Sequence, residues 1–205
     1  MIMQLPLRCL KYLDESHFAS RGSCVRDLTP HSLSSIHAEL RRNRGVGPVG
    51  KEVFGVNNDS ISENYAVTLM IGLYGGLNPV FLEYREDGMN TSLDFCRFVV
   101  KAVNAGFLVP GDVLVCDNAK VHKSPFMTIE LNAWLAARSI TIVYLPTYSP
   151  ELNPCEMVFG FVKNSLRISR NSDNTFFDEV NERFHAISHD GMERFYMHCL
   201  RAGMT

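Results

Sequence analysis

Residues 113–122 read VLVCDNAKVH, an order that places an acid directly after a run built for burial. Four apolar residues suited to a buried strand are followed by Asp117. A second apolar run, residues 141–145, leads through the loop PTYSPELNP to another acid, Glu156, at the start of an expected helix. Functional groups of α/β sheets gather at the carboxyl ends of strands. Both acids are therefore candidate functional residues.

The second half of the chain alternates helical and extended patterns. Residues 91–106 begin with a cap at Thr91 or Ser92, carry apolar side chains at helical spacing and stop at Gly106. A strand over 112–117 follows, ending on the acid. The other elements expected here are a helix over 125–139, a strand over 140–145, a helix over 154–168 and a helical tail over 175–200 that breaks at Asp190–Gly191.

The first half has the pattern of a strand meander. Residues 7–14 form a strand that ends at Asp14, and residues 20–50, rich in Ser, Gly, Pro and Arg, form mostly loop. Antiparallel strands followed by alternating helices and strands predict an α/β fold, with a mixed sheet and helices on its faces. The further strands expected are 52–56, 65–73 and 79–86, the last two joined by a Gly-rich hairpin.

Length and composition limit the class of protein. A chain of 205 residues can form one domain with a proper core, and is short for two. No apolar run reaches the roughly eighteen residues of a membrane span, and Arg8 and Lys11 interrupt the N-terminal apolar stretch, against a signal peptide. Six cysteines without a CxxC pair favour buried thiols in a reducing compartment. We expect an intracellular protein that is neither secreted nor membrane-bound.

Charge indicates the class of protein less clearly than length and composition do. The formal net charge of −2 is not typical of a nucleic-acid-binding protein. Local basic groups exist in RRNRG, residues 41–45, and at Lys163, Arg167 and Arg170. Such short runs are either a solvated face or contacts to phosphate, and the sequence leaves both open.

Three acids follow or end apolar runs, and they can meet. If the strands of Asp14 and Asp117 are neighbours, the two carboxylates converge at one edge, and the helix start can bring Glu156 to them. Carboxylates held close together repel one another unless cations neutralise them. Oxygen ligands of this kind suit Mg²⁺ or Mn²⁺. Two such ions about 3.5–4 Å apart promote phosphodiester chemistry.

Each acid also has a structural alternative. Asn153 and Pro154 make Glu156 the third helical residue, so it can be the acid of a capping box. The side chain of Asp117 can close a turn with its own backbone. The sequence Asp-Glu-Ser from Asp14 can instead begin a helix. Taken singly, none of these signals is specific.

Three motifs together resemble the signatures of the DDE transposase superfamily in its mariner-like branch. They are YLDES at 12–16, LVCDNAKVH at 114–122 and LPTYSPELNPCEMVFGFVK at 145–163. The resemblance spans about residues 7–170 and implies a ribonuclease H-like catalytic core, also shared with retroviral integrases. Its five-stranded mixed sheet has an antiparallel meander, then parallel strands, and flanking helices.

The resemblance also implies site residues and a mechanism. Two Mg²⁺ or Mn²⁺ would be held by the catalytic acids, Asp14 bridging them, Asp117 holding one and Glu156 the other. The core would hydrolyse a phosphodiester at a transposon end and use the freed hydroxyl to attack target DNA. Asn118 and His122 would support the acids without holding the metals themselves, although His122 can equally be a partly buried structural histidine. The residues expected to contact DNA phosphates are Lys120, Lys123, Lys163 and Arg167.

This chain departs from the family pattern at its N-terminus. Members usually carry a helix-turn-helix region there, whereas the first catalytic strand here begins within ten residues of Met1. We expect a single catalytic domain over 1–205, with a core over about 7–170, a helical extension over 175–205 and no recognition region. Its partner would be DNA, with room for a homodimer on transposon ends, in the nucleus of a eukaryote or otherwise the cytoplasm. The alternatives are a non-catalytic relic that binds DNA or protein, and a ribonuclease H-type nuclease.

Overall fold

The structure is a computed structural model that describes residues 6–20, 63–73, 78–86, 91–119, 125–147, 149–168 and 174–202. The chain forms two compact units, residues 1–18 with 65–205 and residues 19–64. Only the ends of the second unit are described, where the Ser20 N–H donates to the Glu63 carbonyl and the Glu63 N–H donates to Ser20 Oγ, both at 2.9 Å. The strand expected over 52–56 and nearly all of the loop expected over 20–50 lie outside the described residues.

The first unit is built on a five-stranded mixed sheet in the order β3-β2-β1-β4-β5. β2 and β3 run antiparallel, with Ala66 opposite Arg85, whereas β4 runs parallel to both β1 and β5. The predicted mixed sheet is therefore confirmed. The strands are β1 (Leu10–Ala19), β2 (Asn64–Gly72), β3 (Val80–Arg85), β4 (Val113–Cys116) and β5 (Thr141–Tyr144).

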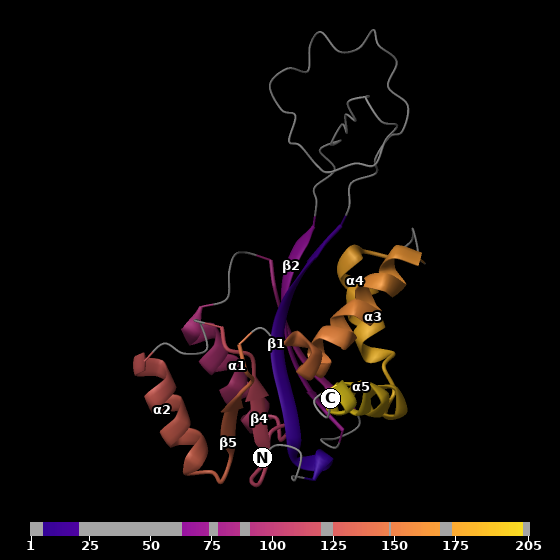
Figure 1. Ribbon diagram of the computed structural model, residues 1–205. Helices are drawn as coiled ribbons and strands as arrows, with labels where there is room; N and C mark the ends of the chain where they lie inside the picture. The colour runs from indigo at the N-terminus through magenta and orange to yellow at the C-terminus, as the bar shows by residue number, and fades with distance from the viewer. Residues whose placement is uncertain are drawn as a thin grey trace, which may run out of the picture. The chain divides into compact units, whose positions relative to one another are not determined.

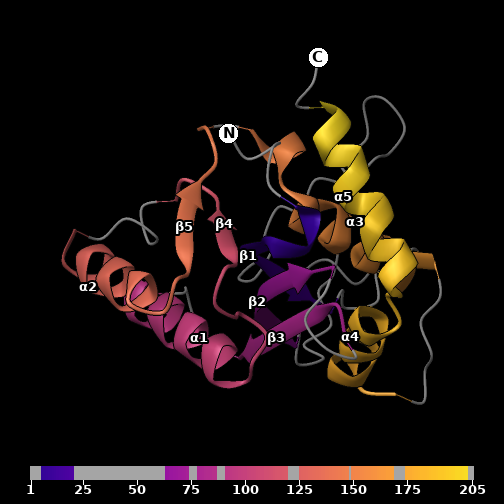
Figure 2. The same ribbon diagram turned by 90° about the horizontal axis from the view of Figure 1, so that it is seen from below.

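Helices cover both faces of this sheet (Figure 1). Seen from below, α1 and α2 lie on one face, and α3, α4 and α5 lie on the other (Figure 2). β1 serves both layers, because successive side chains of a strand point to opposite faces. Leu10 and Tyr12 belong to the core cluster with α3–α5, and Leu13 to the cluster with α1 and α2. The helices are α1 (Ser92–Asn104), α2 (Pro125–Ala136), α3 (Pro154–Ile168), α4 (Phe176–His185) and α5 (His189–Ala202).

β1 differs from its prediction at both ends. Residues 7–9 form a short 3-10 helix, and the strand runs on past Asp14. Phe18 explains this extension, because its buried ring packs against Phe159 and Phe184 at centroid distances of 6.2 and 5.5 Å. Asp14 thus lies inside a strand. Both the predicted strand end and the alternative helix start at this acid are wrong.

The C-terminal tail forms two helices as predicted, but its break lies earlier than Asp190–Gly191. Residues 186–188 separate α4 from α5. Ser188 caps α5, since its Oγ accepts the Gly191 N–H at 3.1 Å. Gly191 therefore lies in the first turn of α5, and the local glycine signal was misleading.

α5 is fixed in the core by Tyr196, whose side chain is 1% exposed. Its hydroxyl donates to two carbonyl groups, that of Leu10 at 3.0 Å and that of Ile71 at 3.1 Å. Its ring meets Tyr12 edge-on at a centroid distance of 5.2 Å. One side chain thus joins α5 to β1 and β2, so the C-terminal helices are part of the core.

Two expectations from composition can be compared with the described part of the chain. None of the helices described there is long and apolar enough to cross a membrane. The cysteines described there are free: Cys9 is half-buried, and Cys96, Cys116, Cys155 and Cys199 are buried. Buried free thiols are therefore confirmed for Cys96, Cys116, Cys155 and Cys199, and Cys9 differs in being half-buried.

Gly160 lies on the exposed side of α3, where an added Cβ would meet no heavy atom within 4 Å. Glycine inside a helix costs about 1 kcal/mol relative to alanine. We expect Gly160→Ala to raise the free energy of unfolding by about 1 kcal/mol in urea denaturation. Gly72→Ala is the contrasting control and should destabilise, because its Cβ would lie 2.6 Å from the buried Lys11 side chain. An unchanged or lowered stability of Gly160→Ala would contradict this prediction.

Candidate active site

Asp14 and Asp117 are brought together by the pairing of β1 with β4. The parallel register aligns Leu13 with Cys116, so Asp14 and Asp117 are the next pair along. Neighbouring strands lie about 4.8 Å apart, which places the two backbones side by side at the end of β4. Leu13 belongs to the layer of α1 and α2. Asp14 therefore projects to the opposite face, which α3 covers (Figure 2).

Asp14 is the buried acid of the three, at 7% exposed. Its Oδ1 accepts the Glu15 N–H at 2.7 Å, and its Oδ2 accepts Asn153 Nδ2 at 2.8 Å. Burial raises the pKa of the Asp14 carboxyl to about 7, opposed by the hydrogen bond from Glu15 and reinforced by the negative charges of Asp117, Glu156 and Glu15. The β1–β4 register and the bond from Asn153, which lies directly before the helix of Glu156, bring the three predicted acids into one neighbourhood.

Asp117 lies immediately past β4, as predicted. Its Oδ1 accepts the Ala119 N–H at 3.0 Å, so the turn left open as an alternative is formed. Asn118 Nδ2 donates to Thr147 Oγ1 at 2.9 Å. Asn118 thereby ties the loop after β4 to the loop after β5.

Glu156 lies in the first turn of α3. Asn153 caps this helix, because its Oδ1 accepts the Cys155 N–H at 3.1 Å. The N–H of Asn153 donates instead to the Pro150 carbonyl at 3.0 Å, so the reciprocal bond of a capping box with Glu156 is not formed. The capping-box alternative is wrong, and the Glu156 side chain is exposed.

Asn153 is the residue of this site that the sequence did not indicate beyond its role as a cap. Its bond to Asp14 joins positions 139 residues apart. No local pattern can show such a contact. The available signal was indirect: the motif that carries the third acid also contains an amide side chain at the start of the helix.

The chemistry of the site fits a hard divalent cation. Its donors are carboxylate oxygens, which Mg²⁺ and Mn²⁺ prefer. Burial is the main cause of the raised pKa of Asp14, and the neighbouring negative charges that add to this shift are charges that a cation would offset. Within the described residues, no three His, Cys, Asp or Glu side chains are close enough together to hold a metal ion. The acids thus share one face without surrounding a common point.

Of the basic residues expected to contact DNA, Lys163 and Arg167 lie in the described part of the chain. Lys163 and Arg167 are exposed on α3, seven and eleven residues after Glu156, which puts all three on one side of the helix. Lys163 Nζ donates to Ser16 Oγ at 2.6 Å, and Arg167 donates to Asn164 Oδ1 at 2.7 Å. The residues outside the described part of the chain are Lys120, His122 and Lys123.

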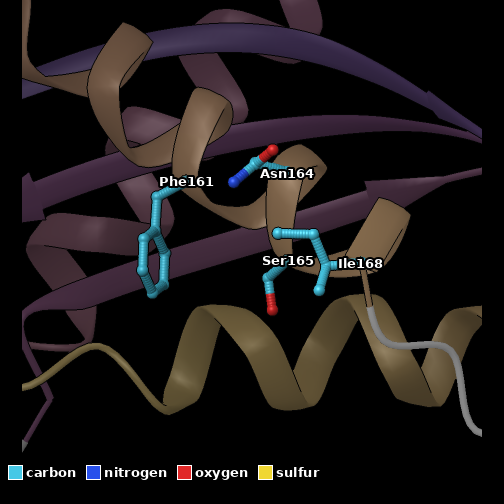
Figure 3. A pocket seen from close by; sticks show the side chains of 4 residues that line it. All are labelled: Phe161, Asn164, Ser165 and Ile168. Carbon is cyan, nitrogen blue, oxygen red and sulfur yellow. The ribbon is translucent and has the colours of Figure 1, made fainter.

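A shallow pocket of about 250 Å³ lies on another side of α3. Its lining residues, Phe161, Asn164, Ser165 and Ile168, all come from that helix (Figure 3). Phe161 and Ile168 are 49% and 75% exposed. None of the predicted acids lines it, so the pocket is separate from the acidic site.

A mixed five-stranded sheet between two helical layers is a ribonuclease H-like fold. Its acids lie in β1, directly after β4 and at the start of α3. The sequence model of the family described as DDE superfamily endonuclease matches residues 34–176. The chain belongs to this family. The match includes Asp117 and Glu156 but begins after Asp14. The placement of Asp14 in the site therefore depends on the register of β1 with β4.

Solved structures of the Mos1 transposase share this fold. The Mos1 strand transfer complex matches with a TM-score of 0.62 and 12% identity, covering 96% of this chain and 52% of that chain. The Mos1 mariner paired end complexes with Mn and with Mg match with TM-scores of 0.60 and 0.61 and 13% identity, covering 96% of this chain and 54% and 55% of theirs. This chain thus spans about half the length of these structures. A comparison with curated proteins finds no match.

Proposed function

We propose that this chain is the catalytic domain of a transposase, which hydrolyses phosphodiester bonds at the ends of a DNA element and joins those ends to target DNA. The observation that carries the proposal is the β1–β4 register, which sets Asp14 beside Asp117 on the face where α3 presents Glu156. Membership of the DDE endonuclease family and the fold shared with the Mos1 strand transfer complex support it.

In this proposal Asp14, Asp117 and Glu156 hold two Mg²⁺ or Mn²⁺ ions. The Mos1 complexes with Mn and with Mg support a divalent cation. Such a pair activates the attacking oxygen and stabilises the leaving oxygen of a phosphodiester. The protein holds the Asp14 carboxylate in place through two donated hydrogen bonds.

The remaining residues would orient the loops and bind DNA. Asn118 keeps the loops after β4 and β5 together through Thr147, and we assign His122 a role in supporting the acids. Lys163 and Arg167 lie along α3 beyond Glu156 and would contact phosphates, which gives affinity without reading sequence. We assign this role to Lys120 and Lys123 as well.

The partner in this proposal is DNA, and the assembly is a homodimer that holds two transposon ends. The paired end complexes of Mos1 support DNA as the partner. The reaction would take place where that DNA is found, in the nucleus of a eukaryote or otherwise in the cytoplasm.

Cleavage should require Mg²⁺ or Mn²⁺ and fail in Ca²⁺, whose larger and looser coordination positions the reacting oxygens poorly. The measurement is nicking of supercoiled plasmid DNA with each ion at equal concentration, followed on agarose gels. Glu156→Gln in Mn²⁺ is the matched control for a contaminating nuclease and should be inactive. Full activity in Ca²⁺ or in chelator, or none in any ion, would count against the proposed function.

A further inference from the structure

Asn153 is a buried side chain, 3% exposed, that uses both ends of its amide. Its Oδ1 accepts the Cys155 N–H at 3.1 Å, and its Nδ2 donates to Asp14 Oδ2 at 2.8 Å. The orientation of the amide is fixed by chemistry, because the backbone N–H of Cys155 can meet only the amide oxygen, which leaves the NH₂ group for Asp14. A single orientation of the Asn153 amide therefore makes both contacts at once.

The carboxylate of Asp14 is consequently held at both oxygens. Oδ1 receives the N–H of the adjacent Glu15, and Oδ2 receives the amide of Asn153. Each carboxylate oxygen can accept two hydrogen bonds. These contacts set the plane of the group while leaving acceptor capacity on both oxygens for a cation.

We propose that Asn153 is a positioning residue for the metal-binding acids, an inference that rests on the proposed function. Its amide orients Asp14 in β1, and its capping of α3 fixes the helix turn from which Glu156 projects. The same side chain thus connects the first acid to the element that carries the third. A change that removes only its NH₂ group should loosen the site without unwinding the helix.

Asn153→Ser separates the two contacts. Serine is also a good helix cap and keeps an oxygen for the Cys155 N–H, but its side chain is too short to reach Asp14. Mn²⁺ titrated by calorimetry, with and without a random-sequence DNA duplex, should bind at least about tenfold more weakly than to the parent, as is usual when an outer partner of a ligand is lost. Plasmid nicking should fall at limiting Mn²⁺ and recover in part at saturating Mn²⁺.

Thr175→Ala is the matched control. Thr175 Oγ1 accepts the Asp178 N–H at 3.1 Å at the start of α4, a helix that carries none of the three acids. Its loss removes a helix cap away from the site and so controls for a general loss of stability. It should lower the melting temperature and leave the affinity for Mn²⁺ unchanged.

A second measurement uses the parent protein, should the serine variant fail to fold. The side-chain amide protons of Asn153 should shift in NMR spectra as Mg²⁺ is added, at the concentrations at which the ion binds. Equal Mn²⁺ affinity of the parent and Asn153→Ser, or amide protons that do not respond, would overturn the inference alone. No Mn²⁺ binding by the parent, with or without DNA, would overturn the proposed function with it.

Discussion

Asn in place of Asp117 should abolish DNA cleavage while leaving the fold intact. The substitution keeps the size of the side chain and an oxygen for the Ala119 N–H, but it removes the negative charge next to Asp14 in the β1–β4 register. Loss of an outer partner of a metal ligand costs about 10–100-fold, so loss of a direct ligand should cost more than about 100-fold.

Three measurements test this prediction. Circular dichroism and thermal unfolding should match those of the parent, Mn²⁺ binding should be lost, and plasmid nicking in Mn²⁺ should disappear. Asp190→Asn removes an exposed acid from the first turn of α5 and should cleave like the parent. Residual cutting near the parental rate would exclude Asp117 as an essential ligand.

The largest expected effect on stability comes from Phe159→Ala. Phe159 is 2% exposed, and its ring packs against those of Phe18 and Phe184, each at a centroid distance of 6.2 Å. The three rings join β1, α3 and α4. Truncation of a buried phenylalanine costs about 3–5 kcal/mol, a large part of the roughly 5–15 kcal/mol that stabilises a typical domain.

Phe161→Ala provides a control in the same helix. Its side chain is 49% exposed, so its removal should change the free energy of unfolding by less than about 1 kcal/mol. Urea denaturation of both variants compares burial directly, because residue type, helix and substitution are the same. Equal losses in the two variants would contradict the described packing of α3.

The sequence predicted the parts of this molecule that depend on local pattern. Apolar runs of strand length predicted β4 and β5, and an acid directly after Val113–Cys116 predicted the position of Asp117. The true end of β1 could not be found in this way, because the strand beyond Asp14 pairs with β2 and Phe18 packs against helices far along the chain. The same is true of Asn153, whose contact with Asp14 depends on the folded sheet.

The outcome for the acids shows how local and tertiary interactions compete. A capping box was a sound local prediction for Glu156, but the N–H that it requires is already bonded to Pro150. The turn at Asp117 was equally local and is formed. A carboxylate offers about four acceptor positions and this bond takes one of them, so the turn and the proposed role as a metal ligand are compatible.

The alignment of β1 with β4 restricts how this chain can change in length during evolution. Insertion or deletion of one residue between Leu10 and Asp14 would turn Asp14 to the other face of the sheet, since strand side chains alternate. The stretch from Asp117 to Glu156 is less constrained, because its loops can lengthen without moving either strand. Alignments of related chains should therefore place their gaps after the second acid and leave the ten positions 10–14 and 113–117 free of them.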